Sequence, residues 1–125
     1  MVEDDDALRK VLELRLTLEG FDVILAADGQ EGLDALTEQP DCAITDLMMP
    51  RLDGYGFCRR TRATSGFEML PIILLTAHQR DADVDDLLEL GGIVYMNKPF
   101  DAPTLAGTLR EMVADRDEEL RAKAS

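Results

Sequence analysis

The sequence contains no tryptophan, a single histidine and only two cysteines, and aromatic residues make up 5% of its 125 residues. Aromatic side chains are therefore too few to build the base-stacking surfaces that bind single-stranded nucleic acids. Cys42 and Cys58 lie far apart, without the close Cys and His spacing of a zinc site. We therefore expect two buried free thiols in a reducing compartment rather than a disulfide framework.

Basic residues are also scarce, because 13 Lys and Arg face 26 Asp and Glu and leave a net charge of −13. Such a field repels nucleic-acid phosphates and anionic membranes, so we expect no nucleic-acid partner and no membrane partner. The apolar runs, such as the one at 72–75, are far shorter than the ~20 residues that cross a bilayer. The acidic start of the chain does not resemble a secretory signal, which predicts a cytoplasmic location.

Short apolar runs alternate with longer stretches of helical spacing. Four runs predict strands buried on both faces, and a stub precedes them: 23–26, 42–45, 71–76, 93–96 and the stub at 1–2. Five stretches predict helices: 7–19, 30–38, 55–63, 82–90 and from 104 toward the end. This alternation predicts an α/β fold, with a doubly wound five-stranded parallel sheet and helices on both faces.

The first predicted helix carries apolar residues on roughly one face, and a glycine follows it as a stop: Leu8, Val11, Leu12 and Leu18, then Gly20. The hydrophobic content of 46% and the chain length indicate one domain, which we assign to residues 1–113. Residues 114–125 are highly charged, and they either extend the last helix or begin a linker.

Chemistry-bearing residues follow the predicted strands, and the carboxyl ends of parallel strands share one edge of a sheet. These residues are the acids at 3–6, then Asp46, Thr76 and Lys98. Helix capping by Asp5 or Asp6 is an alternative explanation for part of the acidic run. If the first and third strands are neighbours, Glu3, Asp4 and Asp46 converge, and Mg²⁺ would relieve their repulsion.

Four segments resemble, in order, the motifs of bacterial response-regulator receiver domains: Val2-Glu3-Asp4-Asp5, Ile44-Thr45-Asp46-Leu47-Met48-Met49-Pro50 with Asp53-Gly54 after it, Leu75-Thr76-Ala77, and Tyr95-Met96-Asn97-Lys98-Pro99-Phe100. The resemblance covers residues 2–113 and implies a (βα)5 flavodoxin-like fold. Only Met1 and Val2 precede the acidic run, where receiver domains usually have several apolar residues. The first strand is therefore short, or the chain starts upstream of this numbering.

The resemblance implies a role for each matching residue. Asp46 would accept a phosphoryl group from a sensor histidine kinase or a phosphotransfer protein, in a reaction that requires Mg²⁺. Metal ligands would be Glu3, through water, together with Asp4, Asp46 and the backbone carbonyl of Met48. Thr76, the backbone N–H of Ala77 and Lys98 would bind phosphoryl oxygens, and Thr76 and Tyr95 would act as the switch.

Other interpretations remain open for these residues and for the protein. Lys98 could be a surface lysine, Thr76 a cap, and Tyr95 an ordinary half-buried aromatic residue of the sheet. The main alternative function is a phosphorylation-independent interaction module with the same fold, and a phosphatase with an aspartate nucleophile is a third. The main hypothesis is a two-component signalling domain that acts on an unknown output domain or protein and catalyses only its own phosphorylation and dephosphorylation.

Overall fold

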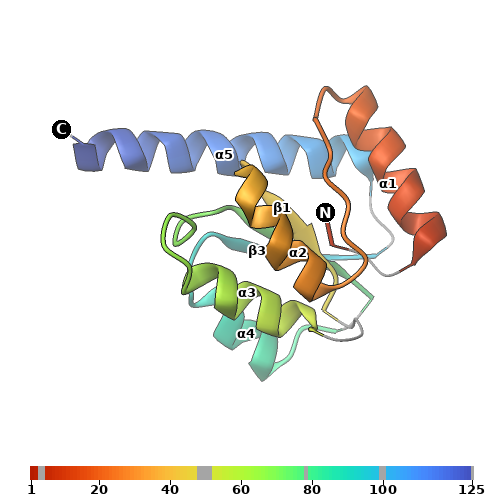
Figure 1. Cartoon of the computed structure of the whole chain (residues 1–125), viewed down its shortest axis with the longest axis horizontal. Coiled ribbons are helices and arrows are strands. Elements are labelled where there is room, and N and C mark those ends of the chain that lie inside the picture. The colour runs from red at the N-terminus through yellow and green to blue at the C-terminus, as the bar shows by residue number, and fades with distance from the viewer. Residues whose placement is uncertain (3–4, 48–51, 78, 99–100, 125) are drawn as a thin grey trace.

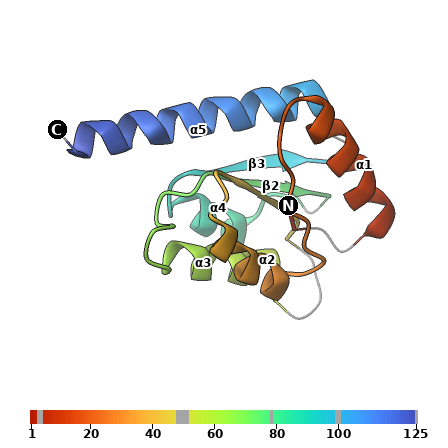
Figure 2. The same cartoon turned by 45° about the horizontal axis from the view of Figure 1, so that its top comes forward.

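The computed structural model of the chain describes residues 1–2, 5–47, 52–77, 79–98 and 101–124. These ranges contain the following elements: α1 (Asp6–Leu18), α2 (Gly29–Ala35), the 3-10 helix η1 (Leu36–Glu38), β1 (Ala43–Thr45), α3 (Gly54–Arg62), β2 (Ile72–Thr76), α4 (Ala82–Leu88), β3 (Ile93–Asn97) and α5 (Ala102–Ala124). Figure 1 shows α1 and α5 on one side of the sheet and α2, α3 and α4 on the other. The turned view in Figure 2 shows the same three layers.

The strands pair in parallel in the order β1-β2-β3. Val2 adds parallel bridges to Ala26 on one side and to Thr45 on the other. The order across the sheet, among the described residues, is therefore Ala26, Val2, β1, β2 and β3. This is the doubly wound arrangement that the sequence predicts. In the part of the chain described, Val2 forms one isolated bridge to Ala26 and one to Thr45. The segments at 1–2 and 23–26 therefore count as single bridges and not as full strands.

Both faces of the sheet are buried, and β2 divides its side chains evenly between them. Ile72 and Leu74 pack toward α3 and α4 in a cluster that includes Phe57. Ile73 and Leu75 pack toward α1 and α5, in a second cluster. This alternation explains why the sequence of β2 is continuously apolar: each face of the strand has its own layer of helices.

Aspartate side chains begin all five of the α-helices described. The residues that precede α1, α2, α3, α4 and α5 each accept a hydrogen bond from a backbone N–H three residues later: Asp5, Asp28, Asp53, Asp81 and Asp101. The expected capping role of Asp5 is thereby confirmed. Gly20 adopts a φ of 95° just beyond α1, and this conformation confirms it as the stop of that helix.

Two details differ from the sequence prediction. Val11 and Leu18 are 47% and 77% exposed, whereas Leu12 and Leu16 are buried, so the predicted apolar face of α1 was wrong at two positions. The reason is that α1 lies at one end of the molecule and presents only a narrow stripe to α5 and the sheet. Residues 36–38 form a 3-10 turn rather than α-helix, because Pro40 disfavours helical backbone at Gln39.

Helix α5 continues without interruption through the charged residues 114–124. No helix among the described residues is both long enough and apolar enough to cross a membrane. Both cysteines are free, as expected; Cys58 is buried, but Cys42 is only half-buried.

Candidate functional site

Asp46 lies directly after β1, and its backbone is held from several sides. Its N–H donates to the carbonyl of Val2 at 3.2 Å, and its carbonyl accepts from the Thr45 hydroxyl at 2.9 Å. Its Oδ1 accepts from the N–H of Leu47 at 2.6 Å. Since Leu47 is fully buried, the carboxylate is anchored to the core at a fixed position at the end of the strand.

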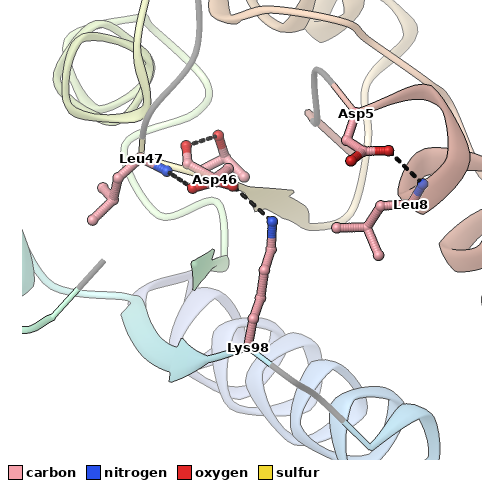
Figure 3. Close-up of polar contacts among 6 residues, drawn as sticks. Asp5, Leu8, Asp46, Leu47 and Lys98 are labelled. Carbon is pink, nitrogen blue, oxygen red and sulfur yellow. Dashed lines mark hydrogen bonds and ion pairs between the residues drawn. The ribbon is translucent and has the colours of Figure 1, made fainter. Parts of the chain in front are cut away.

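Lys98 reaches this carboxylate from the end of β3. Its Nζ lies 2.7 Å from Oδ2 of Asp46, and the two side chains are only 20% and 12% exposed. Figure 3 shows the lysine side chain crossing from β3 to Asp46, where the dashed line marks the ion pair. The structure therefore brings together two residues 52 positions apart in the sequence, and Lys98 is not an isolated surface lysine.

Thr76 ends β2, the strand between the two. Its side chain is buried, and its carbonyl accepts a hydrogen bond from the backbone N–H of Lys98 at 2.9 Å. Ala77 follows it and is exposed. Three adjacent parallel strands thus deliver a carboxylate, a hydroxyl and an ammonium to one edge of the sheet, as the sequence predicts.

Gly54 is a positioning residue whose role sequence reasoning missed. It begins α3, and its N–H donates to the carbonyl of Leu47 at 3.0 Å. A Cβ at this position would stand 2.1 Å from the carbonyl oxygen of Asp46, closer than any real contact allows. The Asp53-Gly54 pair was visible in the sequence, but only the packing of α3 against Asp46 reveals why a glycine is needed.

The remaining predicted site residues are Tyr95 and three residues outside the described part of the chain. Tyr95 is half-buried and packs against the cluster under α3 and α4. Glu3, Asp4 and Met48 lie outside the described residues, so the metal-ligand set stays a prediction. Within the described ranges, no three His, Cys, Asp or Glu side chains converge as a metal site would require.

The donor chemistry at Asp46 nevertheless suits a hard divalent cation. Carboxylate oxygens are ligands that Mg²⁺ prefers, and Asp46 presents its carboxylate at the edge of the sheet. Val2, which directly precedes the acidic pair in the sequence, is hydrogen-bonded to the Asp46 N–H. The carboxylate of Asp46 therefore suits Mg²⁺, and the other ligands of such a site stay a prediction.

The two cysteines do not belong to the edge of the sheet that carries Asp46. Desolvation by burial raises the pKa of Cys58 to about 12, and the cationic side chains of Arg62 and Arg59 only partly oppose it. Burial also raises the pKa of Cys42. Neither thiol is activated as a nucleophile, since an activated cysteine has a lowered pKa.

Comparison with known proteins gives a consistent result. The family model described as "Response regulator receiver domain" matches residues 1–110. Transcriptional regulatory protein AfsQ1 of Streptomyces coelicolor is 44% identical over 126 residues, which cover 100% of this chain and 55% of AfsQ1. Transcriptional regulatory protein CseB of the same organism is 40% identical over 113 residues, covering 90% of this chain and 47% of CseB.

A solved structure agrees with these relatives. The signal receiver domain of a signal transduction histidine kinase from Syntrophus aciditrophicus superposes with a TM-score of 0.80 at 30% identity. The superposition covers 91% of this chain and 87% of that one. The chain spans about half the length of the curated relatives that it matches.

Proposed function

The chain belongs to the response regulator receiver domain family, and from this premise we propose that Asp46 is its phosphoacceptor. As a receiver domain it takes part in two-component signal transduction. The observation that carries the proposal is the ion pair between Asp46 and Lys98 at the shared edge of three parallel strands. A carboxylate held beside a cation at this edge is suited to phosphoryl transfer, which depends mainly on positioning and charge neutralisation.

In the proposed reaction, a carboxylate oxygen of Asp46 forms a bond to the phosphorus of a phosphohistidine on a sensor histidine kinase or phosphotransfer protein. The phosphorus–nitrogen bond breaks, its electron pair and a proton stay with the histidine, and an aspartyl phosphate results. Lys98 would pair with a phosphoryl oxygen, and the Thr76 hydroxyl and Ala77 N–H would bind the others. The chain would catalyse only its own phosphorylation and dephosphorylation.

Mg²⁺ completes the proposal, held by Asp4, Asp46 and the Met48 carbonyl, with Glu3 reaching it through water. When bound, the ion would supply positive charge that stabilises the phosphoryl group during transfer. The ammonium of Lys98 would neutralise further negative charge on the same group. Thr76 and Tyr95 would then convey the phosphorylated state to an output domain or protein.

The same comparison supports a proposal about the partner on the output side. Several relatives are named as transcriptional regulators, and this chain spans about half of their length. We infer that residues 1–125 themselves do not contact nucleic acid, because their net charge is −13. These residues would pass on the phosphorylated state by contact with a separate protein domain or chain.

The test is incubation of the chain with acetyl phosphate and Mg²⁺, followed by intact mass measurement. We expect one added phosphoryl group, lost in Asp46→Asn and retained in Asp86→Asn, a matched control on the exposed face of α4. No added group in the parent chain would favour a phosphorylation-independent interaction module. Sustained turnover of a phosphomonoester would favour a phosphatase.

A further inference from the structure

Helix α2 lies beside α3, and Figure 1 shows the two helices next to each other on the same face of the sheet. Two glycines of α2, Gly29 and Gly32, are buried. At each of them another part of the chain comes so close that a Cβ would collide with it. These two contacts connect α2 with the two parts of the chain that hold the backbone of Asp46.

Gly29 begins α2 and contacts the backbone of Leu52. Its N–H donates to the Leu52 carbonyl at 2.9 Å. A Cβ at this position would stand 2.2 Å from that carbonyl oxygen and 2.9 Å from the carbonyl carbon. Because the neighbouring atoms belong to the backbone and not to a flexible side chain, a larger residue at position 29 would displace Leu52 or the start of α2.

Leu52 lies two residues ahead of Gly54, which packs on Asp46. Asp53, between them, caps α3. Gly54 donates its N–H to the carbonyl of Leu47 at 3.0 Å and lies directly against the carbonyl oxygen of Asp46. A displacement of Leu52 would therefore reach Asp46 through three consecutive residues.

Gly32 lies about one turn further along α2 and contacts Val2. A Cβ here would stand 2.7 Å from Cγ2 of Val2 and 3.0 Å from the ring of Phe57. Val2 is buried, and its carbonyl accepts the hydrogen bond of the Asp46 N–H at 3.2 Å. Helix α2 thus reaches the N–H side of Asp46 through Gly32 and the carbonyl side through Gly29.

We propose that Gly29 and Gly32 are positioning residues of the candidate site, and that α2 sets through them where the Asp46 carboxylate lies. This inference rests on the proposed phosphoacceptor role of Asp46. Phosphoryl transfer depends on the attacking oxygen being in line with the phosphorus, and a misplacement of about 1 Å can slow a reaction ~100-fold. Both glycines act through the backbone that holds Asp46 and not by contact with the phosphoryl group.

The first test compares the rates at which acetyl phosphate and Mg²⁺ phosphorylate the parent chain, Gly29→Ala, Gly32→Ala and Gly92→Ala. Gly92 is the matched control, because it has a φ of 68° and a Cβ there would stand 2.9 Å from Arg62. Its substitution strains the fold immediately before β3, at the end of the sheet opposite Asp46. The rates are measured at a temperature at which circular dichroism shows each chain folded.

We expect Gly29→Ala and Gly32→Ala to react at least about tenfold more slowly than the parent chain, because each added methyl group displaces backbone that holds Asp46. Gly92→Ala should react at the parental rate. Parental rates in both folded α2 variants would overturn the proposal. A slowing of the same size in Gly92→Ala would also overturn it, because loss of stability would then explain all three rates.

Amide hydrogen exchange detects the displacement without any phosphorylation. In Gly29→Ala the Gly54 amide should exchange at least about tenfold faster, because its hydrogen bond beside Asp46 is disturbed. In Gly32→Ala the Asp46 amide should show the same acceleration. Neither amide should change in Gly92→Ala beyond what the change in global stability gives. Unchanged exchange of both amides in the two α2 variants would contradict the proposal.

A second substitution tests the route through Val2. Val2→Ala removes Cγ2, the atom that lies nearest to the methyl group added in Gly32→Ala. The double variant should be phosphorylated faster than Gly32→Ala alone, although Val2→Ala removes core packing. This rescue separates positioning from stability, since a chain that is merely destabilised loses more stability with each substitution. If Gly29→Ala does not fold, Gly32→Ala and its rescue decide the question.

The exchange measurements also keep this inference separate from the proposed function. If the parent chain takes up no phosphoryl group, the phosphoacceptor role of Asp46 fails. Exchange at the Gly54 and Asp46 amides then still decides whether α2 holds Asp46 in place. If the parent is phosphorylated and the α2 variants match it in rate and in exchange, the phosphoacceptor role stands and the positioning role of α2 is wrong.

Discussion

Lys98 and Asp46 form an ion pair across the carboxyl edge of the sheet, with 2.7 Å between Nζ and Oδ2. Both side chains are mostly shielded from water, so the pair should be coupled more strongly than a surface pair. It also neutralises a carboxylate in a chain whose net charge is −13. The contact therefore bears both on stability and on the phosphoryl transfer that we propose.

A double-mutant cycle of Lys98→Met and Asp46→Asn measures this coupling. We expect about 1–2 kcal/mol in the free energy of unfolding, from urea denaturation in the absence of Mg²⁺. The exposed pair Arg80–Asp85 is the matched control, because its side chains are 58% and 53% exposed. Its coupling should stay below about 1 kcal/mol. Equal coupling in the two cycles would mean that Lys98 does not neutralise Asp46 in solution.

Gly54→Ala should displace either Asp46 or the start of α3. An added Cβ would meet the Asp46 carbonyl oxygen at 2.1 Å, so either α3 or Asp46 must shift. We expect a loss of about 1–3 kcal/mol in stability and slower phosphorylation by acetyl phosphate. Gly107→Ala is the control, since a Cβ there meets nothing within 4 Å. It lies inside α5 and should stabilise the fold by ~0.5–1 kcal/mol. An unaltered phosphorylation rate in Gly54→Ala would show that the close approach is unimportant.

Asp53 caps α3 by accepting from the N–H of Gly56 at 2.9 Å. Asp53→Ala should lower the free energy of unfolding by ~1 kcal/mol, whereas Asp53→Asn should retain most of it, because asparagine caps about as well as aspartate. Urea denaturation measures both variants. If Asp53→Asn destabilised as much as Asp53→Ala, charge at the helix end rather than the cap would be responsible.

Cys58 should make the fold sensitive to alkaline pH. Burial raises its pKa from 9.0 to about 12, so the folded protein keeps the thiol proton that the unfolded chain loses. The contribution to stability is therefore fully present below pH 9 and declines as pH rises toward 12. From pH 9 to 10.5 the decline should reach about 2 kcal/mol, measured from urea midpoints. Cys58→Ala should remove this part of the slope, and Cys42→Ala should retain it; identical slopes in all three chains would contradict the assignment.

The sequence predicted the layered fold well because its strongest signals are local. The run at 72–75 is apolar at every position, and such a strand must be covered on both faces, as β2 is. Aspartates ahead of helical stretches marked the starts of helices, and Asp5 confirms one of them. The exposed positions of α1 were not predictable, because periodicity reports a face but not how much of that face the neighbours cover.

The candidate site was predicted as a set of residues but not as a geometry. Asp46 and Lys98 were placed at one edge from the rule for parallel strands, and the structure supplies the contact between them. The role of Gly54 depends on how closely α3 approaches a carbonyl oxygen, which no local pattern encodes.

The most direct test of the central claim locates the phosphoryl group on the chain. After phosphorylation with acetyl phosphate and Mg²⁺, borohydride reduction converts an aspartyl phosphate to homoserine, and peptide mass spectrometry finds its position. We predict homoserine at position 46 alone, and none when Asp46→Asn is treated in the same way. Homoserine at Asp5 or Asp53, or at no aspartate, would contradict the assignment of Asp46 as the phosphoacceptor.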